Sequence, residues 1–300
     1  MKKLLSTAAA IGVFASTSML PALADVSATA LPSLNSATNA TVTTPTDTYM
    51  NVQITGGQGS VGTTNWNTYN IGKDAQVNYE FTAHNQTSLN KVLATGGISQ
   101  IYGKITNSGC SGCGYADTGK VILINPNGVL FGSGANVNLN SFTVSTMDGT
   151  YDSDNNKLTL TKGSNQSDYG IVVQDGAEIY GDKNVAFASN NITLYEGSKI
   201  STSTTPNVTD DTNGEVAYGK IKLVTADGVN YTYYNNGAVS GISDITTSTD
   251  KMMISLNGDL TSGHIDVRNY STNEDSELNL NKATLKAVQA VKGNDGNIWL

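Results

Sequence analysis

The feature that most constrains this chain is the alternation of short apolar runs and turn residues between Lys120 and Met147. Val121 to Ile124 are four consecutive aliphatic residues, which is typical of a strand buried on both faces. Asn125-Pro126-Asn127-Gly128 ends this run, because proline has no backbone N–H and Asn-Gly favours the positive φ of a tight turn. Val129 to Phe131 then begins a second strand.

The same spacing predicts an all-β protein. From Tyr49 onward, short apolar runs are separated every few residues by Gly, Asn and Asp, and no stretch after the first two dozen residues has a convincing helical period. Charged residues make up only 14% of the chain, so the charge pairs that stabilise surface helices are missing.

A weak internal repeat indicates a solenoid. A small residue followed two places later by an aliphatic one recurs after turns. The recurrences are Ala75/Val77, Ala135/Val137, Ala177/Ile179, Ser198/Ile200 and Ala283/Leu285. Their intervals lie near multiples of about 21 residues, which predicts a parallel β-helix with three strands in each rung.

Residues 1–24 resemble a secretory signal peptide. Lys2 and Lys3 precede an apolar segment that is too short to span a bilayer, and Ala22-Leu23-Ala24 fits an A-x-A cleavage site. We therefore expect export through the Sec translocon and a mature chain that begins at Asp25.

The charge balance excludes one class of partner. The formal net charge is −8 and Arg268 is the single arginine, so the chain has no electrostatic footprint for nucleic acid.

Several blocks together carry a family resemblance. Asn125-Pro126-Asn127-Gly128 with its flanking strands closely resembles the N-terminal secretion domain of two-partner-secreted exoproteins, the filamentous-haemagglutinin-like or haemagglutination activity family. The upstream blocks that match in order and spacing are Tyr69-Asn70-Ile71-Gly72, Ala75-Gln76-Val77-Asn78-Tyr79, Leu89-Asn90-Lys91-Val92 and Ser99-Gln100-Ile101-Tyr102-Gly103-Lys104-Ile105. The best match covers residues 50–150.

The resemblance implies a right-handed parallel β-helix with rungs of about 20 residues, an N-terminal β cap and extra hairpin loops. It also implies a secreted or surface adhesin that passes the periplasm. There it would be captured by the POTRA domains of a TpsB-type outer-membrane transporter. Host-cell glycans or proteins would be its receptors. A haemolysin or contact-dependent inhibition toxin exported by the same route is the alternative.

We expect four segments: the signal at 1–24, a flexible lead or weak first strand at 25–48, a secretion core at 49–200, and further rungs at 201–300. The pattern stops in mid-strand at Leu300, so we expect the natural chain to continue.

The Asn125–Gly128 motif has two interpretations, a tight turn only, or a turn that fixes the secretion domain for its transporter. The strand residues expected to support it are Leu123, Ile124, Val129 and Phe131.

Cys110 and Cys113 are the only cysteines, and in an exported chain they predict a local disulfide. Free thiols, or a metal or redox role, are the alternatives. The loop that holds them is longer than in the family pattern.

No catalytic, metal or cofactor site is expected. His84 and His264 have no visible catalytic companions, and the acidic run at Asp152 lacks the spacing of an EF-hand loop. A polysaccharide-active enzyme on a β-helix is the remaining alternative, because catalytic carboxylates converge only in space. The tyrosine cluster at Tyr231, Tyr233 and Tyr234 suggests either an exposed sugar-stacking patch or a ladder within the coil.

Overall fold

The computed structural model describes residues 23, 25–109, 119–205, 218–288, 291–292 and 298–299. Within these ranges the protein consists of β-strands and one short 3₁₀ helix, η1 (Ala94–Gly96), so the all-β prediction is confirmed. None of the helices described could cross a membrane, since none is long and apolar enough.

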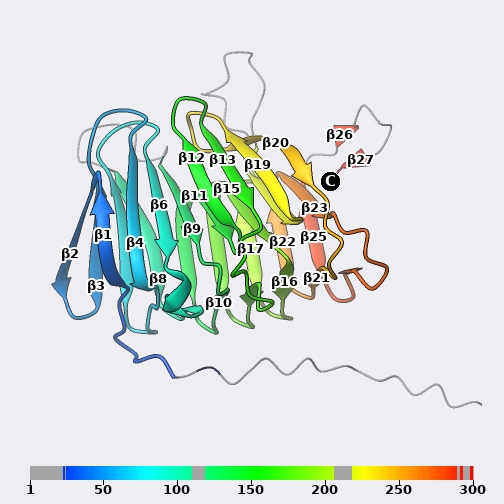
Figure 1. Cartoon of the computed structure of the whole chain (residues 1–300), viewed down its shortest axis with the longest axis horizontal. Coiled ribbons are helices and arrows are strands. Elements are labelled where there is room, and N and C mark those ends of the chain that lie inside the picture. The colour runs from blue at the N-terminus through cyan, green and yellow to red at the C-terminus, as the bar shows by residue number, and fades with distance from the viewer. Residues whose placement is uncertain are drawn as a thin grey trace, which may run out of the picture.

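Most strands belong to three parallel ladders that the chain visits in turn. Figure 1 shows the strands standing side by side from the N-terminal to the C-terminal end of the molecule. Ladder one contains β3 (Tyr49–Ile54), β5 (Gln76–Phe81), β8 (Lys104–Gly109), the first halves of β11 (Asn136–Ser145) and β15 (Glu178–Ser189), β17 (Lys199–Thr202), β22 (Asp259–Ser262) and β25 (Thr284–Ala287).

Ladder two shares β11 and β15 with ladder one, because each of these long strands bends from one ladder into the other. Its members are β4 (Val61–Thr68), β6 (Thr87–Val92), β9 (Lys120–Ile124), the second halves of β11 and β15, β18 (Lys220–Thr225) and β23 (His264–Asn269). Ladder three contains β7 (Ser99–Ile101), β10 (Val129–Phe131), β14 (Ile171–Val173), β16 (Asn191–Leu194), β21 (Met253–Leu256) and β24 (Glu277–Asn279). One passage through the three ladders is called a coil below.

The apolar core lies between the ladders. Inward side chains at paired positions form rows along each ladder, with one residue from each coil in a row. One row of paired positions in ladder one runs Met50, Val77, Ile105, Val137, Ile179, Ile200, Leu260 and Leu285. Aromatic rings fill the space between ladders two and three, where the Phe131 ring stacks on Phe187 at 6.1 Å and meets the edge of Phe142 at 6.0 Å.

The repeated positions recognised in the sequence share this row, but the assumed constant interval is wrong. Val77 and Val137 are two coils apart, because Ile105 lies between them. Val137 and Ile179 are paired in adjacent coils although 42 residues separate them, since a hairpin is inserted there. Of the neighbouring pairs in this row, only Ile179 and Ile200 have the 21-residue interval.

The inserted hairpins form a second sheet over ladder two. β12 (Asp148–Asp152), β13 (Lys157–Thr161), β19 (Gly228–Tyr233) and β20 (Val239–Thr246) are antiparallel neighbours in that order. Their inner face and the outer face of ladder two form a second apolar cluster, which includes Ile122, Ile124, Leu158 and Tyr231. This cover explains why β9 is buried on both faces, as its four aliphatic residues predict.

Two antiparallel strands cover the N-terminal edge. β1 (Ser33–Thr38) pairs with β4, and β2 (Ala40–Thr46) pairs with β3. Both strands lie in the segment expected to be a flexible lead or a weak first strand. β26 (Val291–Lys292) and β27 (Ile298–Trp299) form a separate two-stranded sheet.

Lys120 is a charged group buried where the second sheet meets ladder two. Its side chain is 0% exposed, and its Nζ donates to the backbone and side-chain oxygens of Asn85. Asn85 Nδ2 in turn donates to Asn156 and Asn235, at 3.2 and 3.1 Å, in the turns of the two hairpins. Burial lowers the pKa of Lys120 to about 7. The lysine and the asparagines therefore join ladder two to the tips of the second sheet.

We predict that this lysine makes stability depend on pH. Between the folded pKa of about 7 and the unfolded value of about 10.5, the unfolded chain binds more protons. Relative to Lys120→Met, the wild-type free energy of unfolding should therefore rise by about 1.4 kcal/mol per pH unit in this interval. Urea denaturation of both proteins at pH 7.5, 8.5 and 9.5 measures this, and a difference that stays constant with pH contradicts it.

Candidate functional site

The Asn125–Gly128 motif forms the corner between β9 in ladder two and β10 in ladder three. Asn125 is 0% exposed, so every polar atom of its side chain needs a partner inside the protein. Its Nδ2 donates to Gly97 O and to Ser99 Oγ, both at 2.9 Å, and its Oδ1 accepts from Asn127 N at 2.9 Å. One side chain thus closes the turn and fastens it to the preceding coil.

The backbone of the same corner is bonded to the coils on both sides. Asn125 N donates to Ser145 O at 2.9 Å, and Pro126 O accepts from Ser167 N at 2.8 Å, both in the following coil. Gly128 O accepts from Ser99 N at 3.0 Å in the preceding one. The corner therefore connects three successive coils and is more than a local turn between two strands.

Gly128 occupies a position that only glycine fits. Its φ is 110°, and a Cβ there would lie 2.8 Å from Cδ1 of Tyr169. Gly134, after β10, also has a positive φ of 86°, but a Cβ there would meet nothing within 4 Å. A substitution at Gly134 therefore introduces backbone strain alone, whereas one at Gly128 adds a steric clash.

The strand residues expected to support the corner are buried on both sides of it. Leu123, Val129 and Phe131 belong to the core between the ladders, and Ile124 belongs to the cluster under the second sheet. β9 and β10 do not pair with each other, because each pairs with the equivalent strand of adjacent coils.

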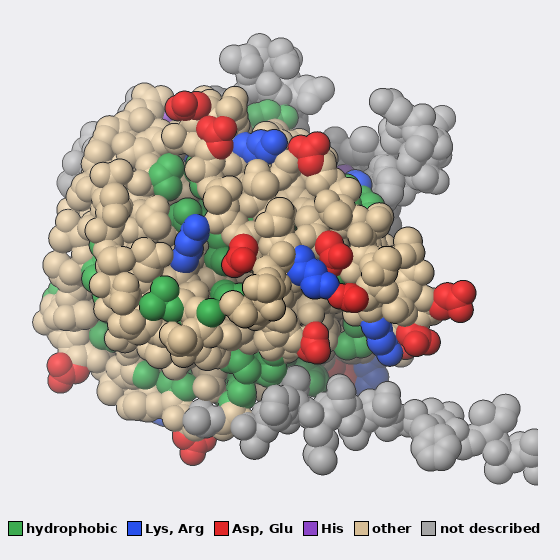
Figure 2. Space-filling view, viewed as in Figure 1, with side chains coloured by type: hydrophobic (Ala, Val, Ile, Leu, Met, Phe, Trp, Pro, Cys, Tyr) green, Lys and Arg blue, Asp and Glu red, His purple; other side chains and the backbone are tan. Residues whose placement is uncertain are grey.

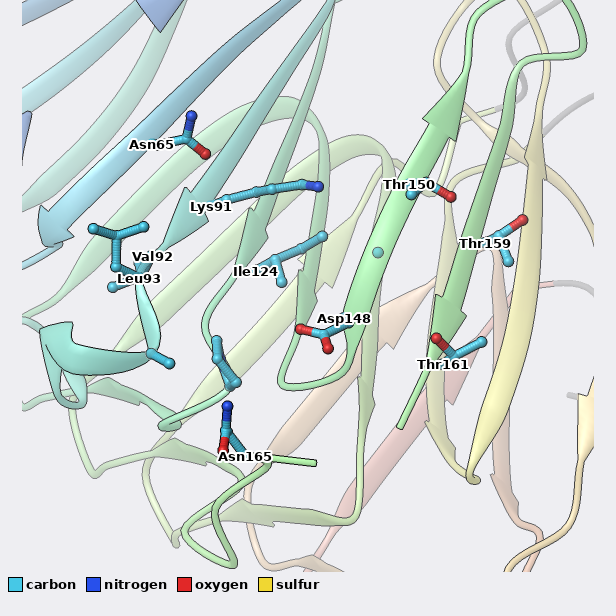
Figure 3. A pocket seen from close by; sticks show the side chains of 13 residues that line it. Asn65, Lys91, Val92, Leu93, Ile124, Asp148, Thr150, Thr159, Thr161 and Asn165 are labelled. Carbon is cyan, nitrogen blue, oxygen red and sulfur yellow. The ribbon is translucent and has the colours of Figure 1, made fainter. Parts of the chain in front are cut away.

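A groove of about 410 Å³ opens beside the corner, between ladder two and the β12–β13 hairpin. Figure 3 shows Lys91 and Ile124 from the ladder on one side and Thr150, Thr159 and Thr161 from the hairpin on the other. Pro126 of the corner contributes to the lining. The groove thus reaches one side of the corner, at Pro126.

Sequence reasoning missed a second buried asparagine, Asn90 on β6. Its Oδ1 accepts from Thr64 Oγ1 at 2.8 Å, Tyr79 OH at 3.0 Å and Trp66 Nε1 at 3.2 Å, all inside the first coils. Its Nδ2 donates to Ile122 O at 3.2 Å in the next coil. The available signal was an asparagine between Leu89 and Val92 in a predicted match block.

The predicted disulfide and the predicted cleavage site cannot be compared with the structure. Cys110, Cys113, Ala22 and Ala24 lie outside the described residues, so the disulfide and the cleavage site stay predictions.

The histidine and the acidic run considered in the sequence have structural surroundings of their own. Burial lowers the pKa of His264 to about 4. Asp152 caps its own turn by accepting from Asp154 N and Asn155 N at 3.0 and 3.2 Å. No group of three metal-ligating side chains occurs among the described residues.

The proposed sugar-stacking patch at Tyr231 and Tyr233 is wrong. These tyrosines are 0% and 5% exposed and pack beneath the second sheet, whose β19 they belong to. They therefore form neither an exposed patch nor a ladder within the coil.

Known proteins resemble this chain in both sequence and fold. The heme/hemopexin-binding protein of Haemophilus influenzae is 29% identical over 135 residues, which are 45% of this chain and 13% of that protein. A second Haemophilus influenzae heme/hemopexin-binding protein is 34% identical over 83 residues, which are 28% of this chain and 8% of that protein. This chain therefore aligns with only a small part of these relatives.

The crystal structure of the HMW1 secretion domain from Haemophilus influenzae superposes with a TM-score of 0.56 and 20% identity. The superposition covers 79% of this chain and 56% of that one, and it supports the fold.

These observations define the class as an all-β domain built on parallel ladders. The family model of the TPS secretion domain matches residues 28–300, and the chain belongs to this family. It is thus the secretion domain of a two-partner secretion exoprotein, and the family implies a cognate TpsB outer-membrane transporter and a secreted or surface location.

We predict that Asn125→Ala lowers the free energy of unfolding by about 2–3 kcal/mol, because Gly97 O and Ser99 Oγ lose a buried donor. Urea denaturation of the chain without residues 1–24 measures the change. A loss below about 0.5 kcal/mol, the size of an ordinary surface substitution, would show that the corner is not structurally important.

We also predict that Gly128→Ala destabilises more than Gly134→Ala. Both substitutions place a Cβ at positive φ, but only the one at Gly128 presses against Tyr169. Gly134→Ala should cost about 1 kcal/mol, and Gly128→Ala roughly 2 kcal/mol more. Equal losses in parallel urea titrations would contradict the steric role of Tyr169.

Proposed function

We propose that this chain is the export-directing part of an adhesin-type exoprotein, and that its three ladders wind as a right-handed parallel β-helix. The match of residues 28–300 to the TPS secretion domain family carries the proposal. The parallel pairing of neighbouring strands within each ladder supports the β-helix. The strong preference of parallel crossovers for the right hand supports the handedness. In this proposal residues 1–24 are removed, 25–48 lead in, 49–200 are the secretion core and 201–300 add further coils.

The proposed route has two steps. The Sec translocon delivers the chain to the periplasm through the signal segment, and the POTRA domains of the transporter then capture it. The Asn125–Gly128 corner contributes by fixing how the opening coils fold, since its hydrogen bonds join three of them. In this proposal the corner acts in export only through its effect on folding.

Folding outside the cell supplies a reason for the chain to move outward. Each completed coil presents strands with unpaired N–H and C=O groups, on which the next segment can form a ladder. Burying the inward side chains then contributes roughly 0.8 kcal/mol for each CH₂ group removed from water.

We propose a non-catalytic role, with host-cell glycans or proteins as receptors. A toxin exported by the same route is the alternative. The binding activity in the relatives' name is not carried over, because the matched segments are only 13% and 8% of those proteins.

An export assay tests the proposal. The full chain is expressed in bacteria with its cognate transporter, and the secreted and cell-retained fractions are measured by immunoblot. We expect Asn125→Ala and Gly128→Val to lower the secreted fraction about tenfold or more, because both disturb the corner that joins the coils.

Two controls make the result specific. Gly134→Ala places a Cβ in open space, and Asn281→Ala changes an exposed asparagine in a turn, so both should be secreted normally. Omitting the transporter should retain every variant. Normal secretion of Asn125→Ala and Gly128→Val would remove the corner from the mechanism, and secretion without the transporter would overturn the proposal as a whole.

A further inference from the structure

Three tyrosines lie together at ladder three. Tyr102 follows β7 and Tyr195 follows β16, at equivalent ends of strands that are three spacings apart in the ladder, about 14 Å. Tyr169 precedes β14, at the opposite end of the strands, and packs on Leu130 and Val172 of β10 and β14, in the cluster that Tyr102 and Tyr195 also contact. These three rings form what is called the tyrosine stripe below.

The hydroxyl groups of the stripe have no partners within the described part of the chain. Tyr169 is 9% exposed, and its hydroxyl is buried without a hydrogen bond. A buried tyrosine hydroxyl ordinarily finds a partner, so this one is an unmet requirement of the structure. Burial and the nearby hydroxyls of Tyr102 and Tyr195 raise the pKa of Tyr169 to about 12, which keeps it a neutral donor.

The stripe continues into a polar groove of about 880 Å³ over β16, β21 and β24, and Tyr195 belongs to both. The floor of the groove presents hydroxyl and amide groups, including Thr193, Ser255 and Asn257. Gln166 forms part of one wall, and its Oε1 is buried without a partner.

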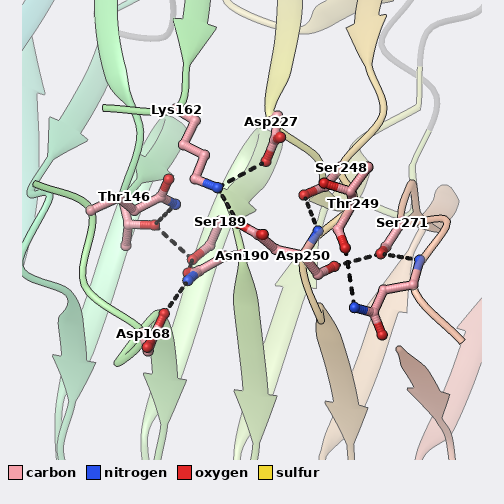
Figure 4. A network of polar contacts seen from close by, with 12 residues as sticks. Thr146, Lys162, Asp168, Ser189, Asn190, Asp227, Ser248, Thr249, Asp250 and Ser271 are labelled. Carbon is pink, nitrogen blue, oxygen red and sulfur yellow. Dashed lines mark hydrogen bonds and ion pairs between the residues drawn. The ribbon is translucent and has the colours of Figure 1, made fainter. Parts of the chain in front are cut away.

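Ion pairs hold the wall of the groove in place. Lys162 bridges Asp250 and Asp227, and Asn190 Nδ2 donates to Asp168 Oδ1 at 3.4 Å, as Figure 4 shows. The lining holds two lysines and three carboxylates, so the groove offers no surplus of positive charge; these residues are Lys162, Lys251, Asp168, Asp250 and Glu277. The visible face of the molecule in Figure 2 likewise shows acidic and basic side chains scattered among uncharged ones.

Leu23 packs against the tyrosine stripe. Cleavage after Ala24, as the sequence predicts, removes this residue and leaves the stripe open in the mature chain.

We propose that the tyrosine stripe and the adjoining groove bind a neutral oligosaccharide, with sugar rings stacked on Tyr102 and Tyr195 and sugar hydroxyls bonded to Tyr169, Gln166 and Asn257. Aromatic rings supply flat apolar surface, and the amides and hydroxyls supply the directional bonds that a polyol requires. The lack of surplus positive charge selects against sulfated or sialylated chains. This inference rests on the proposed adhesin role and names the chemistry of its receptor. Its test does not involve export, although Tyr169 of the stripe lies against Gly128 of the corner.

Saturation-transfer NMR and calorimetry on the chain lacking residues 1–24 test the proposal. The probes are maltohexaose, cellohexaose and chitohexaose, with a heparin hexasaccharide as the acidic comparison. We expect at least one neutral probe to bind, and Tyr102→Ala and Tyr195→Ala each to weaken it by about tenfold.

Tyr180→Ala is the matched control, since Tyr180 is a partly exposed tyrosine of β15 in ladder one and should leave binding unchanged. Circular dichroism confirms that each variant is folded, and Thr193→Val offers a smaller change in the groove with an expected loss of severalfold. Binding of the heparin probe alone, failure of all three neutral probes, or equal affinity in Tyr195→Ala would each overturn the proposal.

Discussion

The backbone of each coil is satisfied only by the coils next to it. In a parallel ladder the N–H and C=O groups of a strand point to its two neighbours, so no coil of this protein is complete alone. The straight strands meet this requirement by regular pairing. The corners cannot, and there the protein uses side chains and turn contacts such as those of Asn125. The burial of Asn125 is thus a consequence of stacking coils whose corners must also exclude water.

The three ladders differ in what covers their outer faces. Ladder two lies beneath the antiparallel sheet of inserted hairpins, so its strand β9 is buried on both faces and Lys120 is buried in the interface. Ladder one faces solvent along most of its length, as the exposed Asn136 and Asn138 of β11 show. Ladder three is intermediate, with the tyrosine stripe at one end and the polar groove at the other.

Periodicity in the sequence was sufficient to predict the all-β class and several members of one ladder row. The small-x-aliphatic recurrence identified positions that do pair, from Val77 to Leu285. It could not give the number of coils, because the hairpin of β12 and β13 lengthens one coil without leaving the ladder. An insertion changes the interval between paired residues while the pairing itself is preserved.

The candidate site was predicted in outline and missed in its partners. The turn of Asn125–Gly128 is legible from proline and glycine chemistry. Its contacts with Gly97 and Ser167 are not, since they depend on which coils become neighbours. Asn90 was overlooked for the same reason, because a single polar residue in a strand has no visible partner until Thr64, Trp66 and Tyr79 converge on it.

The antiparallel strands at the N-terminal edge give the molecule a polarity. β1 and β2 lie across the first parallel strands in the opposite sense, and their side chains are mostly exposed Ser and Thr. At the far end, within the described part of the chain, the last strands of the ladders, β23, β24 and β25, pair with a parallel neighbour on one side. The two ends of the stack therefore differ: one ends in antiparallel strands and the other in parallel ones. In the proposed export, each new coil would therefore add to the parallel strands and not to the antiparallel end.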